Sequence, residues 1–87
     1  MNILFTDTGW TQSTEWQGQD KKTIKRINQL LKSIDRDGAM QGIGKPELLK
    51  HGKSGQYSRR IDEVNRLVYE ISEDQIIVKS CKGHYED

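Results

Sequence analysis

Five side chains in the second half of the chain could together carry out acid–base chemistry on a phosphate. They are a carboxylate, two guanidiniums, an imidazole and a phenol, at Glu47, Arg60, Arg66, His84 and Tyr85. Cleavage of RNA without a metal needs a base that takes the 2′-hydroxyl proton, cations that stabilise a pentacoordinate phosphate, and an acid that protonates the leaving 5′-oxygen. Glu47 and His84 are the candidates for base and acid, because a histidine is partly protonated near neutral pH. A loop carboxylate and a histidine near the end of a chain are also common surface residues, so the hypothesis requires that folding brings them together.

The last third of the chain predicts three consecutive antiparallel strands. Three segments rich in β-branched and aromatic residues, Tyr57–Ile61, Arg66–Ile71 and Gln75–Cys81, are separated by short turn sequences. Connections this short cannot cross over a sheet, so we expect the strands to form a meander. One face of such a sheet packs on a core and the other faces water.

Alternation along these strands separates the two faces. A three-residue loop at 62–64 would keep Ile61 and Leu67 on the buried face and set Arg60 opposite Arg66 on the exposed face. Two like charges that face each other destabilise a sheet unless an anion lies between them. The alternative is that each guanidinium pairs with a nearby carboxylate: Asp62, Glu63 or Glu70.

A short strand and a first helix precede this sheet. Met1–Phe5 is an apolar run long enough for one strand. Asp7 or Thr8 can cap the start of a helix, and Gly18 is a natural stop at its end. We therefore expect a short first helix between the strand and residue 18.

The second helix has the clearest pattern in the chain. Asp20 can cap its start, Gly38 can end it, and apolar residues recur at helical spacing along one side: Ile24, Ile27, Leu30, Leu31 and Ile34. Helices followed by strands, in the order β-α-α-β-β-β, indicate an α+β fold in which two helices pack on one face of a mainly antiparallel twisted sheet. We expect one such domain over residues 1–87, since a chain of this length holds a single small core.

A polar, glycine-rich connection spans residues 38–55, between the second helix and the strands. It lacks the spacing of a phosphate-binding P-loop, although it contains Gly52-Lys53-Ser54. Pro46–Lys50 can form one helical turn with proline at its first position. A connection of this length in a compact domain is more often functional than not, so it is a reasonable place for a base such as Glu47.

Composition argues against several broad classes of protein. Fourteen Lys and Arg residues stand against thirteen Asp and Glu, and this balance argues against indiscriminate binding to polyanions. The sequence shows neither the apolar length of a membrane span nor the pattern of a signal peptide, so we expect a soluble cytoplasmic protein. The single cysteine, Cys81, cannot form an internal disulfide, and its place late in an apolar strand predicts a buried thiol.

Four ordered sequence blocks contain the candidate residues. They are Gly44-Lys45-Pro46-Glu47-Leu48-Leu49-Lys50-His51, then Ser54-Gly55 with Tyr57-Ser58-Arg59-Arg60-Ile61, then Asn65-Arg66-Leu67-Val68-Tyr69, and finally Cys81-Lys82-Gly83-His84-Tyr85. Together they resemble the Txe/YoeB toxins of the RelE/ParE superfamily of bacterial toxin–antitoxin systems. The resemblance extends over nearly the whole chain, and four blocks at compatible spacing are far more specific than any one motif.

The resemblance implies a RelE-like fold and a ribosome-dependent endoribonuclease. Such an enzyme cleaves mRNA in the ribosomal A site without a metal or other cofactor, and leaves a 2′,3′-cyclic phosphate or its 3′-phosphate product. By resemblance, Glu47 corresponds to the general base, His84 to the general acid, and Arg66 to the residue that stabilises transition-state charge. Tyr85 corresponds to the terminal aromatic residue that orients the substrate. Three further basic residues are expected to bind the substrate: Lys50, Arg59 and Arg60.

The same resemblance implies partners. The expected antitoxin is of the Phd/YefM type, with a disordered tail that covers the site and restrains the toxin. Complexes of this kind repress their own operon, so operator DNA is expected only through the antitoxin complex. The ribosome and mRNA are expected as targets, a homodimer is compatible with this interpretation, and no membrane partner is expected.

The chain departs from the family pattern in two places. Asn65 stands where family members carry a histidine before the arginine of the third block, and Glu86-Asp87 extends the chain past the His-Tyr pair. The two added carboxylates bear on the rate of the reaction more than on its type. Two other functions remain as alternatives: a ParE-like inhibitor of DNA gyrase, a branch that lacks the Glu/His pair, and a non-catalytic module that binds ribosomal RNA.

Overall fold

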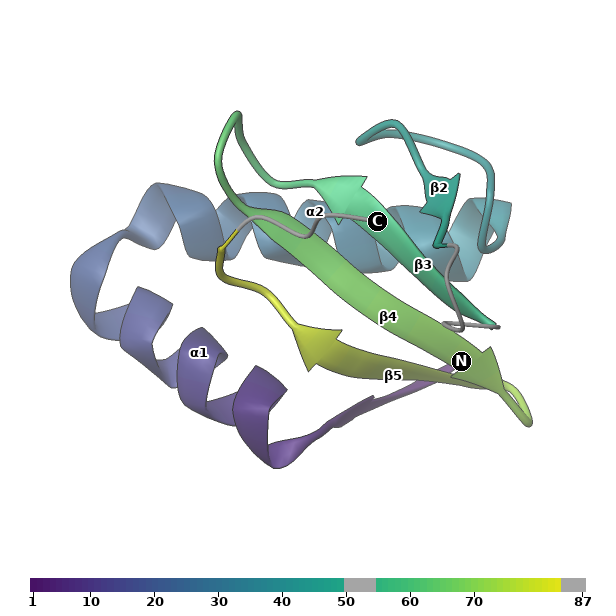
Figure 1. Ribbon diagram of the computed structural model, residues 1–87, viewed down its shortest axis with the longest axis horizontal. Helices are drawn as coiled ribbons and strands as arrows, with labels where there is room; N and C mark the ends of the chain where they lie inside the picture. The colour runs from purple at the N-terminus through teal and green to yellow at the C-terminus, as the bar shows by residue number, and fades with distance from the viewer. Residues whose placement is uncertain (50–54, 84–87) are drawn as a thin grey trace.

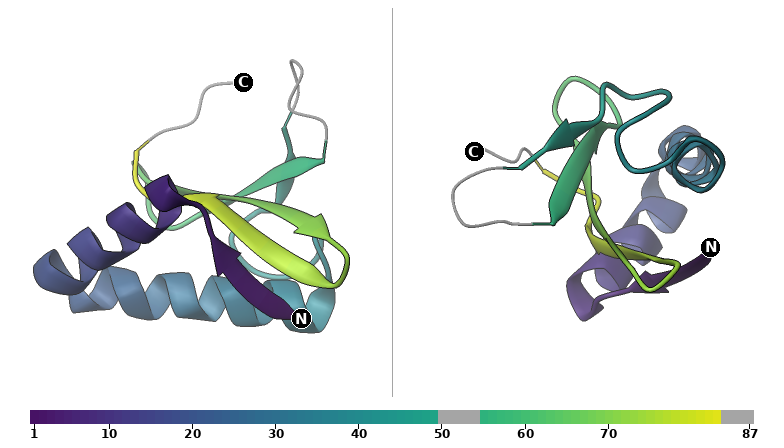
Figure 2. Two further views of the ribbon diagram at one scale, coloured as in Figure 1. Left: turned by 90° about the horizontal axis from the view of Figure 1, so that it is seen from below. Right: turned by 90° about the vertical axis from the view of Figure 1, so that its right-hand side faces the viewer.

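The computed structural model describes residues 1–49 and 55–83, which form a five-stranded sheet and two helices (Figure 1). Along the chain the elements are β1 (Asn2–Phe5), α1 (Asp7–Gln19), α2 (Lys21–Asp37), β2 (Glu47–Leu48), β3 (Gln56–Arg60), β4 (Arg66–Ser72) and β5 (Gln75–Ser80). The strands lie in the order β1-β5-β4-β3-β2, with β1 parallel to β5 and the remaining neighbours antiparallel. Both helices lie on the same side of the sheet (Figure 2). The predicted α+β fold, with two helices on one face of a mainly antiparallel sheet, is confirmed.

Helix α1 begins slightly earlier and ends slightly later than the sequence predicts. Its N-cap is Thr6, whose hydroxyl accepts a hydrogen bond from the N–H of Gly9 at 3.1 Å and lies 3.1 Å from the carbonyl of Lys79. Thr6 is therefore tied both to the helix and to the end of β5, which sets the starting point. The helix passes through Gly18 without stopping, and ends where the N–H of Asp20 donates to a carbonyl of its last turn.

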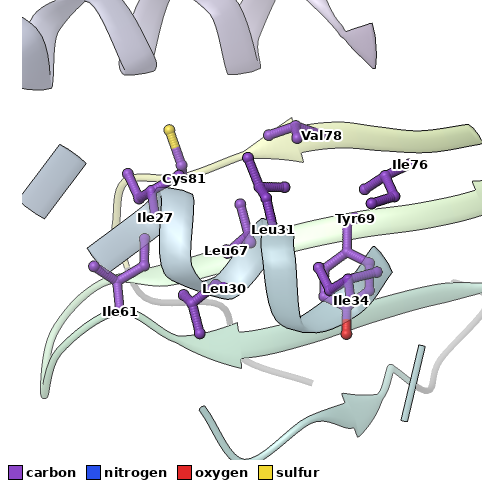
Figure 3. Close-up of a cluster of buried hydrophobic side chains, with 10 residues drawn as sticks. All are labelled: Ile27, Leu30, Leu31, Ile34, Ile61, Leu67, Tyr69, Ile76, Val78 and Cys81. Carbon is purple, nitrogen blue, oxygen red and sulfur yellow. The ribbon is translucent and has the colours of Figure 1, made fainter. Parts of the chain in front are cut away.

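Helix α2 begins and ends at the predicted residues. The carboxylate of Asp20 accepts hydrogen bonds from the N–H groups of Lys22 and Thr23, and Gly38 adopts a φ of +98° at the other end. Its apolar side packs against the sheet in the core (Figure 3), which contains Ile27, Leu30, Leu31, Ile34, Ile61, Leu67, Tyr69, Ile76, Val78 and Cys81. Neither described helix has the length and apolarity needed to cross a membrane.

The predicted helical turn at Pro46–Lys50 is wrong, because Glu47–Leu48 forms the edge strand β2. Glu47 pairs with Ser58 of β3, Leu48 pairs with Tyr57, and the N–H of Leu49 donates to the carbonyl of Gln56 at 2.8 Å. An isolated helical turn would leave the edge of β3 unpaired, whereas the extended conformation satisfies its backbone groups. A proline directly before an edge strand removes no hydrogen bond of the ladder.

The prediction of a buried Cys81 is confirmed. Its side chain is fully buried, and its backbone N–H and carbonyl both bond to α1, through the side chains of Gln12 and Trp16. Burial raises the pKa of the Cys81 thiol to about 11. The end of β5 is thus joined to α1 by both packing and hydrogen bonds.

Candidate active site

Strand pairing places the two candidate arginines on the face of the sheet that is turned away from the helices. Leu67 and Tyr69 belong to the core, so alternation along β4 puts Arg66 on the opposite face. Arg60 pairs with Arg66 across the turn at residues 62–64, as predicted. The hydrogen bond that closes this turn runs from the N–H of residue 61 to the carbonyl of residue 65, at 3.0 Å.

Glu47 lies on the same face, one row away from the arginines. It pairs with Ser58, which in turn pairs with Val68, so these three residues form a row beside that of Arg60 and Arg66. With strands about 4.8 Å apart and a two-residue step of about 6.7 Å, the Cα of Glu47 lies about 8 Å from that of Arg60 and about 12 Å from that of Arg66. Glu47 and Arg60 are exposed and Arg66 is half-buried. The strand register thus puts all three side chains on one face of the sheet, on which Ser58 and Val68 are buried.

The end of the described chain lies directly beside Arg66. The backbone N–H of Arg66 donates to the carbonyl of Gly83 at 3.0 Å, and the N–H of Gly83 donates to Oδ1 of Asn65 at 2.8 Å. His84 follows Gly83 by one peptide bond. Three predicted site residues lie outside the described residues: Lys50, His84 and Tyr85.

The alternative in which a carboxylate pairs with each arginine is not met by direct ion pairs in residues 1–49 and 55–83, although Asp62 lies near enough to Arg66 to be affected by its charge. Neither Arg60 nor Arg66 forms an ion pair there. Asp62 is engaged by its own turn, where it accepts the N–H groups of residues 64 and 65 at 2.8 and 2.7 Å. Glu70 contacts Lys79 at 3.9 Å instead. The Nη1 of Arg66 donates to the backbone carbonyl of Asp62 at 3.3 Å, which orients this guanidinium without cancelling its charge.

The pKa of Asp62 reflects this engagement. Burial alone would raise it, but the hydrogen bonds from Asn65 and Val64 and the nearby charge of Arg66 together hold the pKa of the Asp62 carboxyl below its usual range. Asp62 is therefore an ionised hydrogen-bond acceptor at neutral pH. It supports the turn that carries Arg66.

The expected role of Arg59 in substrate binding is wrong, because its side chain is fully buried on the helix side of the sheet. It pairs with Leu67 of the core, and alternation along β3 sends it to the face opposite Arg60. The acceptors within 3.0 Å of its guanidinium are Tyr69 Oη (2.8 Å), Ser33 Oγ (2.9 Å), Ile43 O (3.0 Å), Gly38 O (2.8 Å) and Gln41 O (2.6 Å). Its charge therefore holds the loop after α2 and does not reach the exposed face.

This loop is part of the glycine-rich connection that the sequence predicts to be functional, and its shape depends on the glycines at 42 and 44. Both have positive φ, at +104° and +87°. A Cβ on Gly42 would collide with Ser33 Oγ, and one on Gly44 would approach a Leu30 methyl carbon to 2.6 Å. The carbonyl of Gly44 accepts the N–H of Arg60 at 2.7 Å, so the loop joins β3 just before the chain enters β2. The loop thereby sets the starting point of the strand that carries Glu47.

Two surface hollows in the described part of the chain lie away from these residues. One of about 260 Å³ lies between β1 and α2 and is lined partly by Ile3 and Leu31, and the other, of about 310 Å³, lies along α1. Neither is lined by Glu47, Arg60 or Arg66.

Comparison with known proteins places this chain among the toxins of bacterial type II toxin–antitoxin systems. A family model described as "YoeB-like toxin of bacterial type II toxin-antitoxin system" matches residues 5–85. Toxin YoeB of Streptomyces coelicolor is 46% identical over 85 residues, which cover 98% of this chain and 100% of that one. The chain belongs to the YoeB toxin family.

Solved structures share the fold over nearly the same length. YoeB in a heterotetrameric YoeB–YefM toxin–antitoxin complex from Staphylococcus aureus is 50% identical, with a TM-score of 0.92 and 98% of both chains covered. A YoeB dimer from the same organism has a TM-score of 0.93 at the same identity and coverage. The parallel β1–β5 pair and both helices therefore belong to the fold of the family.

Proposed function

We propose that this toxin is an endoribonuclease that cleaves mRNA in the A site of the ribosome and thereby inhibits translation. The observation that carries this proposal is the register of β2, β3 and β4, which brings Glu47 to the same face as Arg60 and Arg66. The hydrogen bond between Arg66 and Gly83 supports it further, because the chain then continues directly into His84. The proposal is thus supported by Glu47, Arg60 and Arg66 on one face and by Gly83, the residue before His84, bonded to the backbone of Arg66.

In the proposed reaction, Glu47 removes the proton of a ribose 2′-hydroxyl, and the 2′-oxygen attacks the adjacent phosphorus. Arg66 stabilises the negative charge of the pentacoordinate phosphate. The bond from phosphorus to the 5′-oxygen breaks while His84 donates a proton to that oxygen, and Tyr85 orients the substrate. The products are a 2′,3′-cyclic phosphate, which can hydrolyse to a 3′-phosphate, and a 5′-hydroxyl end.

Substrate binding is assigned to Arg60 and Lys50, which would hold phosphates of the RNA. A formal net charge of +1 provides few contacts to a polyanion. Binding to free RNA that depends on so few phosphate contacts is weak and falls as salt rises. The ribosome therefore supplies much of the positioning, and cleavage of naked RNA is expected to be slow.

Two partners are proposed from the relatives. The YoeB–YefM complex from S. aureus suggests an antitoxin of the YefM type, which would contact operator DNA on behalf of the complex. The YoeB dimer from the same organism suggests that this chain also self-associates. We place its site of action in the cytoplasm, where ribosomes and mRNA meet.

Substitution of the acid and the base in a reconstituted translation assay tests the reaction. Glu47→Gln and His84→Gln should each lower the rate of mRNA cleavage by about 10²- to 10⁴-fold, since each removes one proton transfer. Asn28→Ala, an exposed change on α2, is the matched control and should cleave at the wild-type rate. Primer extension on the mRNA measures the rate and shows whether the cuts are in phase with codons.

The outcomes separate the alternatives. Wild-type cleavage rates in both variants would overturn the assignment of acid and base. Ribosome binding by the wild-type protein without any cleavage would favour the non-catalytic module. Intact mRNA together with double-strand breaks in DNA would favour a gyrase inhibitor.

A further inference from the structure

The peptide groups of Gly83 are held on both sides by the turn between β3 and β4. Its carbonyl accepts the backbone N–H of Arg66 at 3.0 Å, and its N–H donates to the side-chain oxygen of Asn65 at 2.8 Å. Because Asn65 and Arg66 form hydrogen bonds to the N–H and to the carbonyl of Gly83, they fix both the position and the orientation of this residue. Gly83 has a φ of +91°, so the chain turns sharply where it passes this point.

Asn65 is itself held in one orientation by Asp62. The Nδ2 of Asn65 lies 3.1 Å from Oδ2 and 3.3 Å from Oδ1 of Asp62, and its backbone N–H donates to Oδ1 at 2.7 Å. Its carbonyl accepts the N–H of Ile61 at 3.0 Å. The side chain thus donates on one side and accepts on the other, which a carboxamide can do and an ionised carboxylate cannot.

We propose that Asn65 is a positioning residue, which fixes Gly83, the residue before His84, relative to Arg66. The inference rests on the proposed function, because it concerns how the acid is placed for the same reaction. Asn65 directly precedes Arg66 in the chain, and its side chain holds Gly83, which directly precedes His84. One side chain therefore links the segments that carry Arg66 and His84. Misplacement of a reacting group by about 1 Å can lower a rate by about 10²-fold.

The exposure of this network distinguishes positioning from stability. The bonds among Asp62, Asn65 and Gly83 lie at the surface. Exposed hydrogen bonds add little net free energy of folding, because water replaces a lost partner. Loss of the Asn65 side chain should therefore free Gly83 locally while the core remains intact.

The test compares Asn65→Ala with Asn28→Ala, an exposed asparagine of α2 that takes no part in the network. Hydrogen exchange by NMR should show faster exchange of the Gly83 amide in Asn65→Ala, with the amides of Tyr69 and Val78 as protected as in the wild type. Cleavage on programmed ribosomes should show kcat lowered by about tenfold or more with KM unchanged, since substrate binding is kept and only the acid is misplaced. Asn28→Ala should match the wild type in both measurements.

A pair exchange provides the rescue. Asp62→Asn combined with Asn65→Asp reverses the donor and acceptor between the two side chains and keeps an acceptor for the Gly83 amide. This double variant should regain most of the kcat and of the Gly83 protection that Asn65→Ala loses. Unchanged kcat in Asn65→Ala, with or without faster exchange at Gly83, would overturn the positioning role. A wild-type protein that leaves mRNA on ribosomes intact would overturn the proposed function instead, while the exchange data would still show whether Asn65 holds Gly83.

Discussion

Arg59 and Arg60 are neighbours in sequence, but the pleat of β3 sends them to opposite faces of the sheet. Arg60 is exposed beside Arg66, where its charge is available to a phosphate. Arg59 is buried and surrounded by carbonyl and hydroxyl oxygens, so its charge is used to hold the loop after α2. The same residue type therefore has a structural role at position 59 and, in the proposed function, a binding role at position 60.

This contrast predicts different effects of the same substitution. Arg59→Lys should lower the free energy of unfolding by about 3 kcal/mol or more, because a lysine has three N–H donors in place of five and leaves buried acceptors unsatisfied. Arg60→Lys, on the exposed face, should change it by less than about 0.5 kcal/mol. Urea unfolding followed by tryptophan fluorescence measures both. Equal stabilities of the two variants would contradict the structural role of Arg59.

The alternation of buried and exposed residues along a strand predicted the position of single side chains correctly. The placement of Arg60 opposite Arg66 followed from keeping Leu67 on the buried face, and the structure confirms it. The same alternation, applied one residue earlier, would have moved Arg59 into the core. The link from Asn65 to Gly83 could not be predicted, because it joins a turn to a distant segment through one side-chain oxygen.

At the scale of elements, α2 depends on a carboxylate at its start. The hydroxyl of Thr23 donates to Asp20 at 2.9 Å, and this bond, with the backbone N–H groups of Lys22 and Thr23, holds the pKa of Asp20 below its ordinary value of 3.8 although desolvation opposes the shift. The folded protein therefore releases this proton more readily than the unfolded chain. The ionised carboxylate adds stability above pH 3.8, and this contribution is lost as the pH falls through the lower pKa of the folded state.

The role of Asp20 as a charged cap predicts that stability depends less on acidic pH when this charge is removed. Asp20→Asn keeps a hydrogen-bond acceptor but does not titrate, so its urea midpoint should fall less between pH 7 and pH 3 than that of the wild type. Glu73→Gln, in the exposed turn between β4 and β5, is the control for a simple change of charge. A fall in Asp20→Asn as large as in the wild type would show that the cap makes no contribution to the pH dependence.

Elements with strong local patterns were predicted and those that depend on distant partners were not. Helix α2 has both caps and an apolar stripe within its own sequence, so its limits were correct. Strand β2 has only two residues, and its extended form is set by the open edge of β3 rather than by local preference. The parallel pairing of β1 with β5 likewise has no local signal, because its partner lies at the other end of the chain.

At the scale of the whole molecule, Cys81 is a natural probe of the intact core. It is fully buried where β5, α1 and α2 meet, and with a thiol pKa of about 11 about one molecule in a thousand carries a thiolate at pH 8. Iodoacetamide should therefore modify Cys81 only as the protein unfolds, in parallel with the loss of tryptophan fluorescence in urea. The control is the Cys81→Ser, Ser72→Cys double variant, whose thiol lies at an exposed position and should react with iodoacetamide at once. If native wild-type protein were labelled equally fast, the core would not be closed around Cys81. Mass spectrometry measures both.

The parallel contact between β1 and β5 has a consequence for synthesis. Asn2 faces Gln75 and Phe5 faces Val78, so the first strand to leave the ribosome has to wait for one of the last. Pairing over so long a stretch of chain is slow to form, because the intervening residues lose much of their freedom before the contact is made. The sheet of a newly made toxin therefore stays incomplete until β5 has left the ribosome, and the toxin cannot reach its final structure before that point.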